Sequence, residues 1–160
     1  MRLCSRSTLI AHALLPALAA LAGCTSVVPE ALRGQVDRGL TYPQLSQDPE
    51  AYRGRLVLMG GEVVRVEPGQ RDLVLTLTER PLSPADESPL LGHESRGDLV
   101  VQVPGAARAA FREGDVLTVV GAVLGRQAAG GLPAVPRLES RSITVWSVAR
   151  PQPHSGALRW

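Results

Sequence analysis

The sequence has few of the side chains that thiol, metal or base-stacking chemistry needs. Its 160 residues include two cysteines, three histidines and no lysine, and the cysteines are Cys4 and Cys24. Aromatic residues make up 3% of the chain, which leaves few platforms on which nucleic-acid bases stack. A length of 160 residues favours one domain. These shortages count against redox, zinc and nucleic-acid functions.

The first residues have the pattern of a secretory signal peptide. Arg2 and Arg6 precede the run LIAHALLPALAALA (9–22), which is apolar except for His12. This run is shorter than the roughly 20 residues that a membrane-spanning helix needs. Pro16 also disfavours the alternative of a buried helix, because proline removes a backbone donor. We therefore predict a cleaved signal peptide over residues 1–23.

The end of this segment predicts a covalent lipid anchor. Leu21-Ala22-Gly23-Cys24 resembles the lipobox of bacterial lipoproteins, and it lies where an apolar signal run ends. The resemblance implies cleavage before Cys24 and attachment of acyl chains such as palmitate to its sulfur and new amino terminus. Several such chains anchor a protein durably, whereas one binds marginally. Thr25 stands where an aspartate would favour retention in the inner membrane, so we expect the outer membrane.

Removal of the signal peptide changes the number of free thiols and the net charge. Cys4 leaves with it and Cys24 is used for the anchor, so no thiol remains for a disulfide or a metal. Loss of Arg2 and Arg6 lowers the formal charge from +2 to zero. A neutral body gives no electrostatic reason to expect nucleic-acid binding.

The remaining chain divides into three predicted parts. Residues 24–40 have mixed charge and no sustained periodicity, which indicates a lipid-anchored tether. Residues 41–149 form the predicted β domain, and residues 150–160 a flexible C-terminal tail. Within the domain, TYPQLSQDPEAYRG (41–54) contains helix-start and helix-stop signals, so short helical turns are expected there.

Alternating apolar residues predict strands in the rest of the domain. The expected strands cover residues 55–67, 72–79, 98–103, 115–124 and 143–149, with a glycine- and proline-rich connection over 125–140. Gly60-Gly61 is expected to let the first strand bulge or bend. About five strands with short helical turns and long loops predict an all-β fold, a small, partly open OB-like β-barrel. A β-sandwich is the alternative.

A search for chemistry yields no site. His93 lies beside Ser95, but this pair does not form a nucleophile elbow, and His154 lies near the C-terminus. Asp86-Glu87 lacks the spaced oxygens of a calcium loop, and no dinucleotide fingerprint occurs. We therefore predict no catalytic, cofactor-binding or metal-binding residues, no cofactor, and no enzymatic activity. A hydrolase using His93 and Ser95 is a further hypothesis.

An OB-like barrel raises ligand binding as the alternative function. A nucleic-acid site needs a basic groove and aromatic platforms. Here the arginines alternate with acidic residues, and Trp146 is the one aromatic residue in the predicted strands. We expect a mixed-charge surface and a Trp146 in the core or at the barrel rim.

Several motifs resemble those of the starvation-inducible outer-membrane lipoproteins, the Slp family. They are Asp48-Pro49-x-x-Tyr52-x-Gly54 with Val57 and Gly60-Gly61-x-Val63, Arg80-Pro81-Leu82, Gly114-Asp115 with Leu117 to Gly121 and Gly125, and Val145-Trp146. With the lipobox, the resemblance covers roughly residues 20–146. It implies a lipid-anchored envelope protein associated with stress or stationary-phase physiology, and it supplies no catalytic residues.

These observations predict a non-enzymatic outer-membrane lipoprotein that is anchored through Cys24 and faces the periplasm. Its partners are then the outer membrane and an envelope protein of unknown identity, with no nucleic acid. The alternative is a membrane-tethered periplasmic OB-fold module that binds an oligosaccharide, a nucleic acid or a small ligand.

Overall fold

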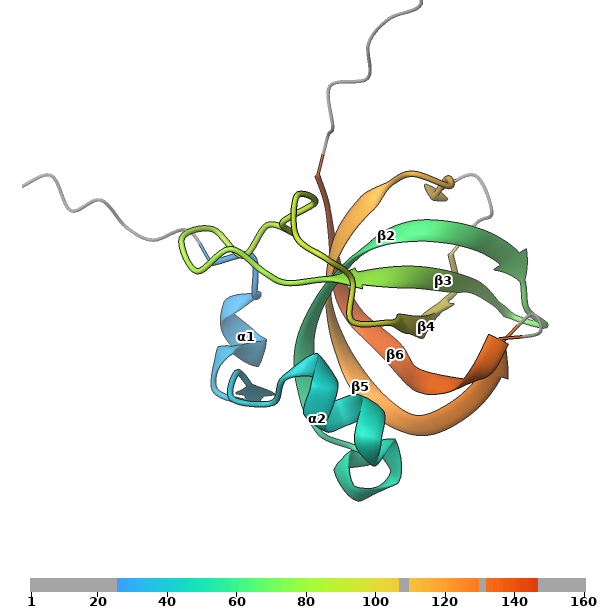
Figure 1. Ribbon diagram of the computed structural model, residues 1–160, viewed down its shortest axis with the longest axis horizontal. Coiled ribbons are helices and arrows are strands. Elements are labelled where there is room, and N and C mark those ends of the chain that lie inside the picture. Colours follow the sequence, from blue (N-terminus) through green and yellow to red (C-terminus); the bar gives the residue numbers. More distant parts are fainter. Residues whose placement is uncertain (1–25, 107–109, 130–131, 147–160) are drawn as a thin grey trace, which may run out of the picture.

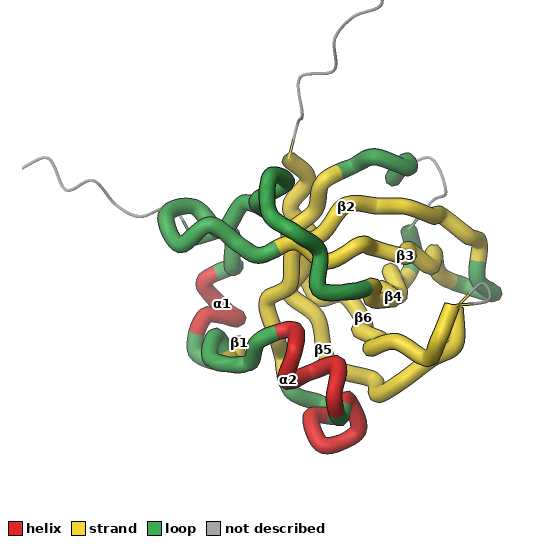
Figure 2. Tube along the Cα trace, in the orientation of Figure 1, coloured by secondary structure: helices red, strands yellow, loops and turns green. Residues whose placement is uncertain are grey.

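The structure is a computed structural model that describes residues 26–106, 110–129 and 132–146. The expected signal peptide, Cys24 and the expected tail from residue 150 lie outside the described residues. The elements, drawn in Figures 1 and 2, are α1 (Glu30–Arg33), β1 (Val36–Asp37), α2 (Tyr42–Gln47), the 3-10 turn η1 (Pro49–Tyr52), β2 (Leu56–Pro68), β3 (Asp72–Arg80), β4 (Asp98–Pro104), β5 (Val116–Ala129) and β6 (Leu132–Trp146).

Five of the strands close into a barrel. Around the ring the order is β2, β3, β4, β6 and β5, and β5 pairs again with β2. All of these pairings are antiparallel except β4 with β6, which is parallel. The short β1 adds a parallel pairing to the start of β2. The predicted small OB-like barrel of about five strands is confirmed, but the ring is closed where a partly open one was expected. A sheet that closes on itself excludes the sandwich.

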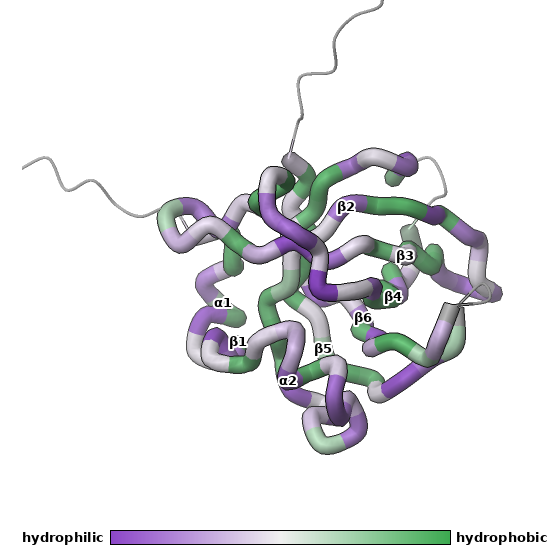
Figure 3. The backbone as a smooth tube through the Cα atoms, in the orientation of Figure 1, coloured by the Kyte–Doolittle hydropathy of each residue, from purple (hydrophilic) through white to green (hydrophobic). Residues whose placement is uncertain are grey.

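The barrel is filled by the inward-facing residues of its strands. In β3, Leu73, Leu75 and Leu77 are at most 1% exposed, as the alternation predicts. Leu99 and Leu117 are fully buried beside them. In Figure 3, where hydrophobic residues are green, green stretches recur along the strands of the barrel. Each fully buried leucine contributes about 1.5–3 kcal/mol, so the barrel's stability comes mainly from this core.

The helical turns expected over residues 41–54 are present and pack against the barrel. Thr41 and Gln44 form a capping box at the start of α2. Leu45 is fully buried in the core cluster, and the Tyr42 hydroxyl donates a 2.7 Å hydrogen bond to the Asp98 carbonyl. Gly54 has φ +79°, a left-handed conformation that glycine adopts without steric cost. The start and stop signals were therefore interpreted correctly.

The glycine pair in β2 does not form the bulge that was one of the two predicted alternatives. The register shift of β2 against β3 lies between Val63 and Arg65, beyond Gly60-Gly61. A Cβ on Gly61 would lie 2.7 Å from the Thr78 carbonyl oxygen, and one on Gly60 would meet the Leu82 side chain. The two glycines thus permit close approach of neighbouring chain and do not form the bulge.

The predicted connection over 125–140 was wrong. In the structure β5 runs to Ala129 and β6 begins at Leu132, so the two form one long hairpin. Prolines in β6 had suggested a loop, yet Pro136 pairs with Arg126 of β5. β4 pairs only with the part of β6 from Arg137 to Glu139. The residues of β6 before Arg137 therefore have a neighbouring strand, β5, on one side alone. A missing N–H is tolerated at such an edge. Of the expected last strand, residues 147–149 lie outside the described residues.

The segment expected to be a tether differs from that expectation where it is described. From Ser26 onward it contains α1 and β1, and β1 pairs with Leu56 and Val57 of β2. Val28 is 1% exposed. The sequence lacked periodicity here because each element is only a few residues long. Which residues link the domain to a membrane stays a prediction.

Gly61→Ala is expected to lower the free energy of unfolding by about 1–3 kcal/mol, because its methyl group meets a backbone oxygen that cannot easily move. Urea unfolding measures this change. Gly34→Ala is the matched control, since a Cβ there has nothing within 4 Å. Equal stability of the two variants would contradict the close-approach role of Gly61.

Candidate functional site

The loop between β3 and β4 holds Glu87 in an uncommon backbone conformation. Glu87 has φ +62°, the only positive φ among the described non-glycine residues. Its N–H donates to the Ser83 carbonyl at 2.9 Å, and Ser83 N–H donates to the Ser88 carbonyl at 2.8 Å. Leu90 N–H donates to the Pro81 carbonyl at 2.8 Å. These bonds fix the loop in a shape that overcomes the cost of the left-handed residue.

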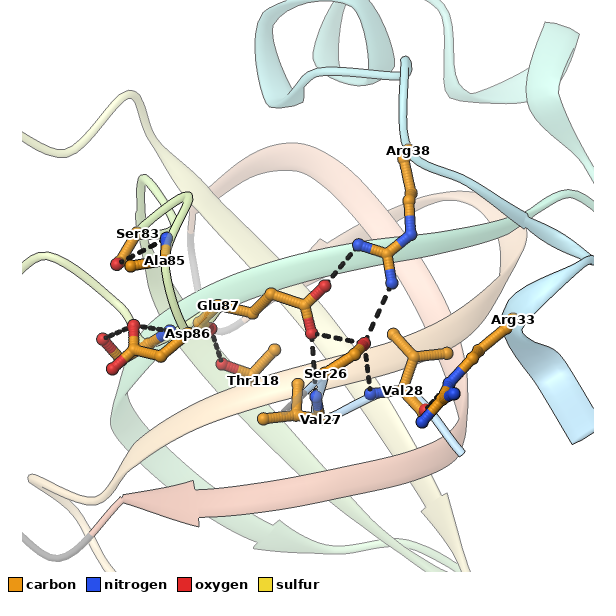
Figure 4. Close-up of polar contacts among 11 residues, drawn as sticks. Ser26, Val27, Val28, Arg33, Arg38, Ser83, Ala85, Asp86, Glu87 and Thr118 are labelled. Carbon is orange, nitrogen blue, oxygen red and sulfur yellow. Dashed lines mark hydrogen bonds and ion pairs between the residues drawn. The ribbon is translucent and has the colours of Figure 1, made fainter. Parts of the chain in front are cut away.

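The Glu87 carboxylate binds the N-terminal segment. One oxygen, Oε2, accepts 2.9 Å hydrogen bonds from the Ser26 hydroxyl and the Val27 N–H, and Oε1 pairs with the Arg38 guanidinium (Figure 4). The Arg38 side chain also donates to the Ser26 hydroxyl at 3.1 Å. The Glu87 side chain is 12% exposed and the Arg38 side chain 48% exposed, so the bonds to Ser26 and Val27 are partly shielded from water and the pair with Arg38 lies at the surface. We call this group of Ser26, Val27, Arg38 and Glu87 the clasp.

The backbone of Glu87 is bonded to the barrel wall. Its carbonyl accepts a 2.7 Å hydrogen bond from the Thr118 hydroxyl of β5. The indole N–H of Trp146 in turn donates to that hydroxyl at 2.9 Å. Thr118 is 2% exposed and Trp146 is half-buried at the last residue of β6. Trp146 therefore lies at the rim, bonded to the chain that carries the clasp.

The charge of Glu87 is stabilised by its partners. Burial would raise the pKa of this carboxyl, but hydrogen bonds from Arg38, Ser26 and Val27 outweigh it and hold the pKa below its usual value of 4.5. The ionised form is thus the one that the clasp binds. Because the folded-state pKa is lowered, the stabilisation is present above pH 4.5 and is lost as the pH falls through the lowered pKa.

Neighbouring contacts hold the same segment in place. Val28 is buried, and the Arg33 Nε of α1 donates to the Val28 carbonyl at 3.2 Å (Figure 4). Farther along, the Arg55 guanidinium pairs with Asp37 of β1 at 3.0 Å. The chain from Ser26 to β2 is therefore fixed to the barrel at successive points.

A second carboxylate, Glu79, lies at a pocket of about 290 Å³ beside α2. It is 4% exposed and accepts a 3.2 Å hydrogen bond from the Arg96 N–H. Burial raises the pKa of Glu79, and burial together with the nearby Asp98 and Glu79 raises the pKa of Tyr42 to about 12. Tyr42 is thus a neutral hydrogen-bond donor at any physiological pH.

A polar cleft of about 460 Å³ lies on the outer side of β3, β4 and β6. Its charged lining residues are Arg71, Asp72, Arg137 and Glu139, so the charges balance. Gln102 bridges Asp72 and Arg137 by side-chain hydrogen bonds. None of its lining residues is aromatic, so it lacks the stacking platform that nucleic-acid bases require.

The residues considered for hydrolysis have structural contacts. The Ser95 hydroxyl donates to the Gly97 carbonyl at 3.0 Å and accepts from the Gly97 N–H at 3.1 Å, closing a turn. His93 is exposed, and its carbonyl accepts from Arg80 at 2.8 Å. His154 lies outside the described residues. Within residues 26–106, 110–129 and 132–146, no group of three or more His, Cys, Asp and Glu residues could hold a metal ion.

The arginines pair with the acidic residues between them. Ion pairs join Arg53 to Glu50, Arg65 to Glu67 at 3.9 Å, Arg80 to Glu62 at 3.6 Å and Arg141 to Glu139 at 2.9 Å. The predicted mixed-charge surface agrees with these contacts. In the described part of the chain, no helix combines the length and apolarity needed to cross a bilayer.

The sequence did not reveal the clasp. In the sequence, Glu87 is one half of an acidic pair without calcium spacing, and its partner Ser26 is 61 residues away. Its left-handed conformation, the feature that sets it apart, has no signal in the run PADES. No short-range pattern could therefore have identified it.

Comparison with known proteins places the chain in a family context. Residues 21–157 match the model of the Outer membrane lipoprotein Slp family. The uncharacterized lipoprotein YeaY of Escherichia coli strain K12 is 32% identical over 112 residues, covering 66% of this chain and 54% of that protein. The chain thus spans about half the length of this relative.

One solved structure shows a weak similarity to this chain. The Schizosaccharomyces pombe Pot1pC bound to single-stranded DNA is 16% identical and has a TM-score of 0.37, over 62% of this chain and 84% of that one. A similarity this low establishes neither a shared fold nor a shared ligand.

Glu87→Gln is expected to lower the free energy of unfolding by about 1–3 kcal/mol at pH 7, because the clasp then loses its charged hydrogen-bond acceptor. The deficit should shrink as the pH falls below 4.5 and be lost through the lowered folded-state pKa, where the native carboxylate is itself protonated. Urea unfolding across pH 3–7 measures both effects. Glu94→Gln, in the exposed part of the same loop, is the control, and an equal deficit there would contradict the role of the clasp.

Glu79→Gln is expected to have the opposite pH signature. Because the folded-state pKa is raised above 4.5, wild-type stability falls as the pH rises through the raised pKa, and the neutral amide should remove that fall. Comparing urea unfolding at pH 4 and pH 7 tests this. Glu67→Gln serves as the exposed control, and a Glu79 variant that keeps the wild-type pH dependence would refute the burial effect.

Proposed function

The chain belongs to the Slp family of outer membrane lipoproteins, and on that premise we propose that acyl chains on Cys24 anchor it and that its barrel serves the bacterial envelope without catalysis. Its role is then structural or interactive, with an envelope protein as the partner, and the barrel faces the periplasm. The observation that carries this proposal is the clasp, which fixes the chain to the barrel from Ser26 onward, two residues after Cys24.

Cys24 is the anchor in this proposal because of its place in the sequence. It follows an apolar run and the small residues Ala22 and Gly23, which is where a lipoprotein signal peptide is cut. Two or more acyl chains give durable attachment, and the neutral charge of the remaining chain adds little electrostatic attraction. The covalent anchor therefore supplies the membrane affinity.

A role without catalysis is supported by how the polar residues are used. The Glu87 carboxylate binds the N-terminal segment, the Ser95 hydroxyl closes a turn, and the Tyr42 hydroxyl joins α2 to β4. Each of these groups maintains the fold by a hydrogen bond within the chain. We include in the proposal an association with starvation or stationary phase, as the family resemblance implies, and its test is the protein level through the growth curve.

The second candidate is a membrane-tethered module that binds a ligand. The polar cleft between Arg71 and Glu139 is the observation that favours it. Its balanced charges and its lining of amide and guanidinium groups suit a small polar ligand or a sugar chain better than a polyanion such as nucleic acid.

Cys24→Ser is expected to abolish acylation and leave an unprocessed precursor, because serine has no thiol to accept the lipid. Metabolic labelling with a palmitate analogue and membrane fractionation measure this. Cys4→Ser is the matched control, because Cys4 lies within the predicted signal peptide, and it should be labelled normally. Normal labelling of the Cys24 variant would overturn the proposal.

A further inference from the structure

We propose that the clasp holds the barrel directly against the headgroup layer of the membrane, with one defined face toward the lipid. This face consists of segment 26–34 and loop 81–96, and we call it the anchor face. The inference rests on the proposed acylation of Cys24. It goes further by assigning which surface of the barrel meets the membrane and which residues set that orientation.

The first step is the length of free chain. Only Thr25 separates Cys24 from Ser26, whose hydroxyl donates to Glu87 at 2.9 Å. Two residues of extended chain reach at most about 7 Å. A cysteine whose acyl chains lie in the bilayer therefore leaves no room for a solvent layer between the headgroups and the clasp.

The second step is that the clasp resists extension. To gain length, the chain would have to break the two bonds to Glu87 Oε2 and then expose Val28, which is 1% exposed. Hydrogen bonds to an ionised acceptor are stronger than those between neutral groups. Beyond Val28, the Arg33 side chain of α1 donates to the Val28 carbonyl, and β1 pairs with β2 of the barrel. The chain cannot easily lengthen into a flexible tether.

The third step is the position of the anchor face in the molecule. In Figure 1, α1 and the outer bend of loop 81–96 lie together on the left side, where the described chain begins. The turn between β2 and β3 lies at the right-hand end of the barrel. An anchor at residue 24 thus brings the first group of residues to the membrane and directs the β2–β3 turn away from it.

The chemistry of the anchor face suits a headgroup layer. Its exposed residues are small or apolar, or carry either charge, and include Pro29, Ala85, Leu91, the acidic Glu30, Asp86 and Glu94, and the basic Arg33 and Arg96. Such a surface has no cluster of cations, so it lacks the polybasic attraction that would bind it to an anionic headgroup layer. The orientation therefore comes from the short covalent connection.

The experiment compares two labelled positions in the full-length protein. Ala85→Cys places a bimane probe on the anchor face and Gln70→Cys places one on the β2–β3 turn; both residues are exposed. With the signal removed and Cys24 acylated, the introduced cysteine is the only free thiol. The protein is reconstituted in phosphatidylethanolamine–phosphatidylglycerol vesicles that carry a nitroxide on the headgroup. The probe at residue 85 should lose most of its emission and the probe at residue 70 little.

A linker variant separates the clasp from other causes. A glycine–serine linker of about ten residues, inserted between Thr25 and Ser26, adds an average reach of about 18 Å. Quenching at residue 85 should then fall toward that at residue 70. The same linker inserted between Arg150 and Pro151 is the matched control and should leave the quenching unchanged.

The measurements distinguish failure of the proposed function from failure of the anchor face. Intact mass reports the acylation: an unacylated product overturns the proposed function and removes the premise of this inference. If the protein is acylated, equal quenching at the two positions refutes the anchor face while leaving the proposed function intact. Strong quenching at residue 85 that survives the linker between Thr25 and Ser26 also refutes it, because the surface itself would then bind lipid.

Discussion

The carboxylate of Glu87 connects parts of the chain that the sequence keeps far apart. The carboxylate oxygens bind the segment that begins at Ser26, while the backbone carbonyl of Glu87 accepts a hydrogen bond from Thr118 in the barrel wall. A residue in the left-handed region is favourable here only because the loop around it is hydrogen-bonded on both sides. If these bonds are lost, the N-terminal segment, the loop and the rim at Trp146 lose their common attachment.

This connection explains how the fold holds the N-terminal segment in a fixed position against the barrel. The leucine core stabilises the barrel, and glycines such as Gly60 and Gly61 allow neighbouring chain to lie against β2. The N-terminal segment and loop 81–96 cover that wall. The carboxylates of Glu87 and Glu79 respond to pH in opposite senses, since Glu87 is stabilised as an anion while Glu79 is penalised by burial. The stabilisation by the clasp is thus present near neutral pH, where the ionised Glu79 is disfavoured by burial.

Much of the fold was predictable because it depends on local patterns. Alternation in β3 and the helix-start signals at Thr41 are short-range, and both were interpreted correctly. The β5–β6 hairpin was missed because the tolerance of Pro136 depends on which strand lies beside it. The clasp was missed for the same reason, since it joins Ser26 to Glu87 across 61 residues and no local pattern marks either one. The predicted anchor, Cys24, lies outside the described residues.

The distance between the barrel and the bilayer is the quantity that tests this account most directly. Neutron reflectometry of the acylated protein on a supported bilayer measures the protein density along the membrane normal. The clasp predicts that this density begins within about 7 Å of the headgroups, the reach of the two residues before Ser26. A hydrated gap of several times that length, as a flexible tether over residues 24–40 would give, would contradict it.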